Sequence, residues 1–258
     1  MSMRDFRFIY GPVASWRLGS SLGIDPLSQK NILCSFDCTY CQLGTNRSKT
    51  DRIAEYVKTE DVVDEINSLP ESRVDYITFS GRGEPSLAAN LGDMIDAVRG
   101  IRKEKICVIT NSSLLYRQDV RHTLVKADLV LAKLDAFSQE MFEKINRPLE
   151  NLSFFLLLEG LRLFRSEFKG KLALQMMFTR DNRNTSGELA KLAEELDPDE
   201  VQINTPTRPC REEALPRNEI RGIKRNFSGF NAVSVYESGT GRVVPISSEN
   251  TLRRRGKI

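Results

Sequence analysis

Three cysteines stand close together near the start of the chain, within the stretch Cys34-Ser35-Phe36-Asp37-Cys38-Thr39-Tyr40-Cys41. At the spacing C-x3-C-x2-C, three thiolates can converge on one iron–sulfur cluster. A four-iron cluster held by three cysteines keeps one iron without a protein ligand, and an open metal position can bind a small molecule. The sequence therefore predicts one [4Fe–4S] cluster on Cys34, Cys38 and Cys41, with one iron open to a small molecule.

Zinc and plain core cysteines are the two alternatives for this stretch. A structural zinc site usually closes with four ligands, and no nearby His or Cys supplies the fourth. Three core cysteines within so short a stretch would be an unexpected coincidence. The chain has 5 cysteines, and their clustering is typical of a reducing compartment rather than of a disulfide framework. The cluster is therefore the favoured interpretation.

The other two cysteines are not expected to join this site. Cys107 stands inside an apolar run, where a buried and inert thiol is the expectation. Cys210 stands beside Arg208 and Arg211, and positive charge lowers the pKa of a thiol. For Cys210 a ligand, a radical relay and an ordinary surface cysteine all stay open.

Composition indicates one ordinary globular chain. With 258 residues, of which 40% are hydrophobic, it is long enough for one α/β barrel with a sizeable core. No apolar run approaches the roughly 18 residues of a membrane span. Residues 1–5 contain no apolar stretch of the kind that a signal peptide needs. We expect a cytoplasmic protein with no membrane partner.

Charge is unevenly distributed along the chain. The net charge is only +3, yet residues 201–258 hold 11 Lys or Arg against 5 Asp or Glu and end in Arg253-Arg254-Arg255-Gly256-Lys257. A basic tail can contact phosphates, although a tail that is simply solvated is the more ordinary interpretation. We expect weak, salt-sensitive RNA binding at most, with the substrate itself unknown.

Strand-like and helix-like runs alternate along most of the chain, which is typical of parallel βαβ units. This pattern predicts an α/β protein, a partial (β/α)6 TIM-like barrel formed by residues 1–211, with residues 212–258 as a C-terminal extension packed on it. Residues 10–26 are rich in Gly, Pro and Ser, so we expect a structured loop there. A seventh, short strand is expected near residues 232–236. The six strand-like runs are residues 30–33, 76–80, 106–110, 129–135, 172–178 and 201–204.

Polar residues at the ends of these runs are the next candidates, since barrel chemistry sits at the C-terminal ends of the strands. Gly81 and Gly83 would let backbone approach a ligand closely, and Glu84 could pair with a cationic amine. The alternative for Glu84 is a tight turn with a solvated carboxylate. Further candidates, each of which could instead be an ordinary strand-end or turn residue, are Asn111 and Ser112 for a ribose or carboxylate, and Asp135, Gln175 and Asn204.

The cysteine stretch, with Tyr40 directly before the last cysteine, resembles the signature of the radical S-adenosylmethionine (SAM) superfamily. This resemblance implies that the open iron chelates the amino and carboxylate groups of SAM. One electron, from a donor such as flavodoxin or ferredoxin, then cleaves the sulfonium to leave a 5′-deoxyadenosyl radical, which takes a hydrogen atom from the substrate. The resemblance also implies that Tyr40 lies near the adenine, and that Gly81, Gly83 and Glu84 hold the methionine amino group.

Within the superfamily, the chain resembles the wybutosine-synthesis group, the tRNA-imidazoguanosine synthetase-like proteins. The tRNA member of that group condenses pyruvate with N1-methylguanosine and holds a second cluster on cysteines ahead of the triad. No cysteine precedes Cys34 here, and no Schiff-base lysine can be assigned. A glycyl-radical activase and a non-catalytic iron–sulfur module therefore stay open as alternatives. The resemblance rests on Tyr10-Gly11-Pro12-Val13, Arg17-Leu18-Gly19, Gln42-Leu43-Gly44, residues 79–87 and residues 202–209.

Overall fold

The structure is a computed structural model that describes residues 6–44, 46–70, 73–237, 239, 241 and 243–255. Residues 1–5, on which the expectation of no signal peptide rests, lie outside the described residues. The same is true of residues 256–258 at the end of the basic tail.

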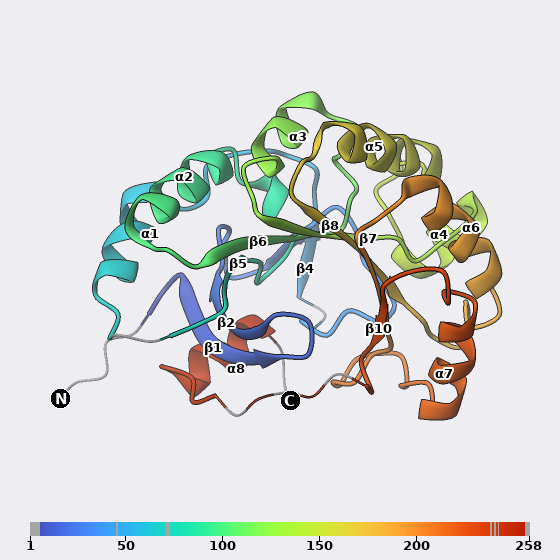
Figure 1. Cartoon of the computed structure of the whole chain (residues 1–258). Coiled ribbons are helices and arrows are strands. Elements are labelled where there is room, and N and C mark those ends of the chain that lie inside the picture. The colour runs from blue at the N-terminus through green and yellow to red at the C-terminus, as the bar shows by residue number, and fades with distance from the viewer. Residues whose placement is uncertain are drawn as a thin grey trace.

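One curved sheet forms the centre of the molecule, and helices cover its convex face (Figure 1). Its eight strands follow the order β1-β2-β5-β6-β7-β8-β9-β10, and every neighbouring pair runs parallel except β1 and β2. The predicted α/β class and partial barrel are confirmed. The strands are β1 Ile9–Ser15, β2 Gly19–Ile24, β5 Tyr76–Phe79, β6 Lys105–Thr110, β7 Leu129–Lys133, β8 Lys171–Met177, β9 Glu200–Asn204 and β10 Ala232–Ser234.

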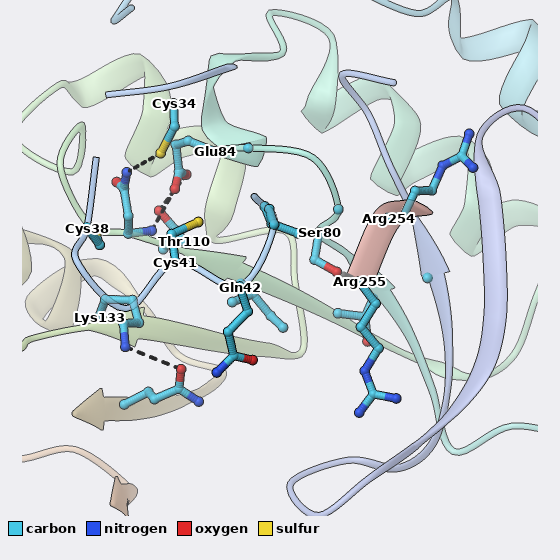
Figure 2. Close-up of a pocket in the computed structure, with 18 of the residues that line it drawn as sticks. Cys34, Cys38, Cys41, Gln42, Ser80, Glu84, Thr110, Lys133, Arg254 and Arg255 are labelled. Carbon is cyan, nitrogen blue, oxygen red and sulfur yellow. Dashed lines mark hydrogen bonds between the residues drawn. The ribbon is translucent and has the colours of Figure 1, made fainter. Parts of the chain in front are cut away.

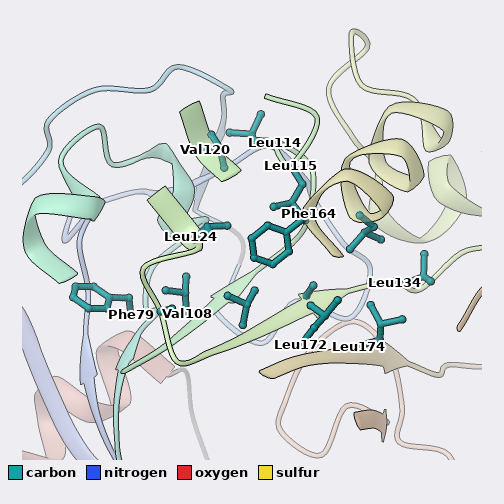
Figure 3. Close-up of a cluster of buried hydrophobic side chains, with 14 of the residues drawn as sticks. Phe79, Val108, Leu114, Leu115, Val120, Leu124, Leu134, Phe164, Leu172 and Leu174 are labelled. Carbon is teal, nitrogen blue, oxygen red and sulfur yellow. The ribbon is translucent and has the colours of Figure 1, made fainter. Parts of the chain in front are cut away.

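The main core lies between the sheet and the outer helices. Val108 and Leu172 from the strands are fully buried against Leu124 and Phe164 from the helices (Figure 3). Burying such a side chain contributes about 1.5–3 kcal/mol, so this layer fixes how the strands lie. The helices are α1 Thr59–Asn67, α2 Leu91–Ile101, α3 Gln118–Leu124, α4 Gln139–Asn146, α5 Phe154–Glu167, α6 Ser186–Leu196, α7 Arg217–Arg225 and α8 Ser248–Arg255, with the short 3-10 turn η1 at Pro85–Leu87.

The prediction of a loop over residues 10–26 is wrong, because this segment forms β1 and β2. Tyr10 lies opposite Gly23, and a Cβ at Gly23 would come within 2.1 Å of the Tyr10 ring. Ser21 is buried, and its hydroxyl bonds that of Thr78 at 2.7 Å. Glycine at position 23 leaves room for the Tyr10 ring to lie directly over β2, which is a common reason for glycine within a strand.

The first barrel strand is therefore β2 rather than residues 30–33. That run contributes to β3, Ile32–Cys34, which pairs with β4, Arg47–Lys49, in a separate two-stranded sheet. The expected seventh strand is present as β10, which pairs with β9. Among the described residues, seven strands of the main sheet are thus mutually parallel, one more than the (β/α)6 prediction counted.

The basic C-terminal segment is packed rather than solvated as far as the structure describes it. Helix α8 lies across β1, where the Gly11 N–H donates to the Thr251 hydroxyl at 3.0 Å. Arg254 is only 3% exposed, and its Nε lies 3.5 Å from a carboxylate oxygen of buried Asp25. The interpretation as a solvated tail is wrong for Arg254, although Arg253 is exposed.

Among the helices of the described residues, none is long and apolar enough to cross a membrane.

Candidate active site

All but two of the predicted site residues meet around one cavity of about 290 Å³ at the C-terminal ends of the strands. Strand-end residues of β5, β6, β8 and β9 line it together with the cysteine stretch, although these segments are far apart in the sequence. The predicted residues that line the cavity are Cys34, Cys38, Tyr40, Cys41, Gly81, Gly83, Glu84, Asn111, Gln175 and Asn204. Ser112 and Asp135 are not among the lining residues.

The cysteine loop begins at the end of β3 and is anchored to α4. Backbone N–H groups of Asp37 and Thr39 donate to the last carbonyls of this helix, at Asn146 (3.1 Å) and Ile145 (2.9 Å). The Phe36 side chain is buried edge-on against Phe142, with ring centroids 5.2 Å apart. These contacts hold the loop firmly while its three cysteines stay half-buried and unbonded to one another.

The charge at the loop is balanced by arginines from outside it. The Asp37 carboxylate lies 3.2 Å from Arg47 and 3.3 Å from Arg211. Burial by itself would lower the pKa of Arg47, but the nearby thiols of Cys41 and Cys34 outweigh this and raise it. Arg47 can therefore offset negative charge on the sulfur ligands.

The donor set fits an iron–sulfur cluster better than a single metal ion. Within the described part of the chain, no three His, Cys, Asp or Glu side chains converge on one ion. In a four-iron cluster each cysteine binds a different iron, so the thiols surround the cluster instead of one atom. Amide N–H groups point at two of the sulfurs, Asn111 at Cys34 (3.4 Å) and Asn146 at Cys38 (3.5 Å). Such hydrogen bonds tune the reduction potential of a cluster.

Burial raises the pKa of the free thiols. The pKa of Cys34 lies far above its usual range, and that of Cys38 is raised to about 12, first by burial and then by the charge of Asp135. Because only thiolates bind iron, cluster assembly at these residues must release protons.

The glycine–glutamate loop docks directly on the strand that leads to Cys34. The Leu33 N–H donates to the Arg82 carbonyl at 3.2 Å, and the Glu84 N–H donates to the Leu33 carbonyl at 2.9 Å. Gly83 adopts φ +141°, and a Cβ there would lie 1.8 Å from the Leu33 oxygen. Only glycine permits both the backbone angle and the close approach.

Glu84 is almost completely buried, at 1% exposure, so the alternative of a solvated carboxylate is wrong. Its Oε1 accepts from the Ser86 N–H (3.1 Å), the Ser86 hydroxyl (2.8 Å) and the Thr110 hydroxyl (2.7 Å), while Oε2 accepts from the Asn111 N–H (2.6 Å). Burial raises its pKa, and these donors partly offset the increase. An ionised carboxylate offers about four acceptor positions on its two oxygens, so Oε2 can still accept from a ligand.

Asp135 lies behind the cavity and positions two residues that line it. It accepts a short hydrogen bond from the Tyr40 hydroxyl, and its Oδ1 lies 3.0 Å from the Lys133 ammonium. The Met177 N–H and the Asn146 amide also donate to it, at 2.7 and 3.1 Å. In the structure Asp135 contacts residues that line the cavity rather than the cavity itself. Its direct contact with the cofactor stays a prediction.

Ser112 is also placed away from the cavity. It is fully buried, with φ +69°, on the turn that follows β6. In the described residues its neighbour Asn111 is the one that lines the cavity, with its amide 2.8 Å from the Ser35 hydroxyl.

Several polar residues of the cavity were given no role by the sequence. The Lys133 ammonium lies 5.0 Å from the centre of the Tyr40 ring, and Lys133 lines the cavity. Its position two residues before Asp135, at the end of the same strand, could have indicated this from the sequence. Arg17 and Arg208 belong to the motifs that resemble the wybutosine-synthesis group. Arg254 and Arg255 were considered only as part of the basic C-terminal tail. Figure 2 shows Arg254 and Arg255 on the opposite side of the cavity from Cys34 and Glu84.

Residues 32–193 match the family model described as the radical SAM superfamily. The chain belongs to the radical SAM superfamily. The match includes the cysteine loop, the glycine–glutamate loop and strands β5 to β8. Membership of this superfamily implies a [4Fe–4S] cluster and SAM as the cofactors.

Relatives of this radical SAM superfamily member carry different names. It is 37% identical to a UPF0026 protein of Methanocaldococcus jannaschii over 231 residues, 87% of this chain and 71% of that protein. It is also 35% identical over 257 residues to a protein of Brachyspira hyodysenteriae named GTPase Obg, but spans only 38% of that protein's length. The family model thus supports the superfamily, and the relatives include UPF0026 proteins; neither comparison supports the wybutosine-synthesis group in particular.

Solved structures share the fold. SuiB of Streptococcus suis bound to S-adenosylmethionine superposes with a TM-score of 0.63 at 14% identity, covering 79% of this chain and 48% of SuiB. At this identity the likeness concerns the fold, and it agrees with the curled parallel sheet described above.

Proposed function

We propose that this protein holds one [4Fe–4S] cluster on Cys34, Cys38 and Cys41 and cleaves SAM reductively, producing a radical that takes a hydrogen atom from a substrate in the same cavity. The cluster, when bound, supplies the electron that breaks the sulfonium bond and leaves a 5′-deoxyadenosyl radical. An electron donor such as flavodoxin or ferredoxin would supply that electron in turn.

One observation carries this proposal: the three cysteines and Glu84 line the same cavity, joined by the backbone pairing of Leu33 with the glycine loop. A cysteine triad alone would suit an electron-transfer module as well. Such a module needs no buried carboxylate beside the metal site. The second acceptor position on Glu84 Oε2 suits an ammonium group, which is what the methionine end of SAM presents.

We expect the remaining lining residues to hold SAM and to exclude water. Tyr40, fixed by its hydrogen bond to Asp135, would pack against the adenine. Asn111, Gln175 and Asn204 offer amide groups to the ribose hydroxyls and the carboxylate. Gly81 and Gly83 expose backbone groups that a side chain would otherwise cover.

The test is formation of 5′-deoxyadenosine by anaerobically reconstituted protein with SAM and dithionite. We expect product from the native chain and from Cys107→Ala, whose thiol is buried in β6 away from the cavity lining. Cys38→Ala should give none. Equal product from Cys38→Ala and the native chain, or none from a fully reconstituted native chain, would refute the proposal.

Wybutosine-type modification of tRNA is a weaker candidate. The motif resemblance and the basic C-terminal charge favour it, but no cysteine precedes Cys34 to hold a second cluster. Arg254, part of that charge, is buried against Asp25 rather than free to contact RNA. We therefore expect RNA binding to be weak and to decrease as salt increases.

A further inference from the structure

Three arginines from outside the cysteine loop line the same cavity. They come from three separate segments: Arg17 from the turn between β1 and β2, Arg208 from the loop after β9, and Arg255 from the last turn of α8. Arg255 stands across the cavity from Cys34 and Glu84, with Gln42 and Ser80 between them (Figure 2). We call Arg17, Arg208 and Arg255 the arginine trio.

The trio has no neutralising carboxylate among the described residues, unlike the other cations of the cavity. Arg254 pairs with Asp25, Arg47 with Asp37, and Lys133 with Asp135. By contrast, no ion pair is formed by any member of the trio within the described ranges of the chain. Within the part of the chain that the structure describes, three positive charges therefore line the cavity without a compensating carboxylate.

The contacts that the trio does make orient its guanidinium groups without supplying negative charge. Arg17 lies 5.3 Å over the Trp16 ring, and its Nε is buried without a hydrogen-bond partner among the described residues. Arg208 donates to the Gln42 side-chain oxygen at 2.5 Å and to the Arg255 carbonyl. Burial, with the charge of Arg255 among the further causes, lowers the pKa of both Arg17 and Arg208 to about 10. An anion bound among them would relieve this repulsion.

We propose that the arginine trio binds a phosphate group of the substrate, as a phosphomonoester or a diphosphate. The proposal rests on the proposed function only in treating the ligand as a substrate of the same cavity. Guanidinium groups bind phosphate oxygens as two-pronged donors, and the three oxygens of a terminal phosphate can receive donors from three directions. SAM carries no phosphate, and its single carboxylate is expected on the open iron of the cluster rather than among the arginines.

A carboxylate ligand fits this arrangement less well. A monocarboxylate offers one negative charge and two oxygens to three guanidinium groups, whereas a phosphomonoester near neutral pH carries close to two negative charges. Neutral donors also line the cavity, since the Tyr10 and Ser80 hydroxyls pair at 2.6 Å. They could donate to a further phosphate oxygen or to a sugar hydroxyl.

The test is anaerobic calorimetry on reconstituted protein without SAM, at ionic strength held constant with chloride. The titrants are pyrophosphate and ribose 5-phosphate for a free small molecule, a 5′-phosphorylated and a 5′-hydroxyl tetranucleotide for a nucleic-acid end, and citrate for carboxylates. We expect saturable binding of the phosphate compounds only. Loss of one charged hydrogen-bonding partner should weaken it by about 10-fold or more.

The variants are Arg17→Gln and Arg255→Gln, with Arg225→Gln on the exposed face of α7 as the matched control. Both trio variants should lose affinity while Arg225→Gln binds as the native chain does. Thermal unfolding of all three checks that the fold persists. Arg255→Gln is the safer variant because the hydrogen bond of Arg255 among the described residues is made by its backbone carbonyl, which the substitution keeps.

Each outcome decides the proposal. Binding of the small phosphates, or of the 5′-phosphorylated tetranucleotide alone, supports it and names the source of the phosphate. Binding of citrate alone, no binding at all, or full affinity in both trio variants would overturn it. Because neither SAM nor turnover is involved, a protein that binds pyrophosphate but forms no 5′-deoxyadenosine would refute the proposed function and leave the phosphate site standing.

Discussion

Among single residues, Glu84 is the most informative. Its carboxylate links the loop after β5 to the end of β6 through hydrogen bonds from Thr110 and Asn111, and it also lines the cavity. Glu84→Gln keeps the side-chain shape but replaces one acceptor by a donor that faces the Asn111 N–H. A charged hydrogen bond is worth about 1.5–3 kcal/mol, so we expect SAM affinity to fall roughly 10- to 150-fold while the cluster still assembles. Calorimetry on reconstituted protein measures this.

Thr110→Val is the matched control, since it removes one donor to Glu84 and leaves the carboxylate charged. If Glu84 acted only by linking the two strand ends through hydrogen bonds, both variants would lose SAM affinity equally. Unchanged SAM binding in Glu84→Gln would remove this residue from the cofactor site.

The cysteines give a second prediction for single residues. Replacing Cys34, Cys38 or Cys41 by Ala should abolish bound iron, because each thiolate would bind a different iron of one cluster. The double variant Cys107→Ala, Cys210→Ala should keep its iron, although Cys210 and Cys38 pack against the same buried cluster of Tyr40, Ile145 and Met177. Iron and sulfide analysis decides both, and iron loss in the double variant would reveal an additional ligand.

At the scale of elements, the docking of the glycine loop on β3 places the cofactor residues together. Gly83→Ala would put a Cβ 1.8 Å from the Leu33 oxygen, so the two backbones must separate. We expect a loss of stability of about 1–3 kcal/mol together with a loss of bound iron. Gly100→Ala in α2, where the new methyl group has open space, should instead stabilise slightly. Urea unfolding and iron analysis compare the two; equal behaviour would contradict the role of this contact.

An element could be predicted from the sequence where its own residues show a pattern, and it was missed where its residues are explained by contacts with distant segments. The strands from β5 to β9 and the loops after them follow from apolar runs that end in polar residues. The hairpin of β1 and β2 was missed because Gly23 and Ser21 are small for a tertiary reason, the passage of Tyr10 and the hydrogen bond to Thr78. Likewise, nothing local in residues 248–255 shows that this helix crosses β1 or that Arg254 meets Asp25.

For the molecule as a whole, α8 closes one side of the cavity by pairing a buried arginine with a buried aspartate. Arg254→Met would leave Asp25 buried without its partner, which typically costs about 3–5 kcal/mol. Arg253→Met, one position earlier and exposed, should change stability by less than about 0.5 kcal/mol. Urea unfolding near pH 7 measures both, and equal midpoints would contradict the packing of α8.

The pH dependence of the Arg254→Met defect follows from the same pair. Burial raises the pKa of Asp25, while Arg254 lowers it, so removing the arginine raises it further. Protonated Asp25 has no charge to compensate, and the difference in stability from the native chain should therefore shrink as the pH falls. A difference that grows toward acidic pH would contradict this assignment.

The most direct measurement is electron paramagnetic resonance of the reduced, reconstituted protein with and without SAM labelled at its amino nitrogen or carboxylate oxygen. If three cysteines leave one iron open beside Glu84, SAM should change the cluster spectrum, and the labels should show magnetic coupling to it. A four-iron cluster whose spectrum stays the same with saturating SAM, and which shows no coupling to either label, would contradict an open iron that binds SAM in this cavity.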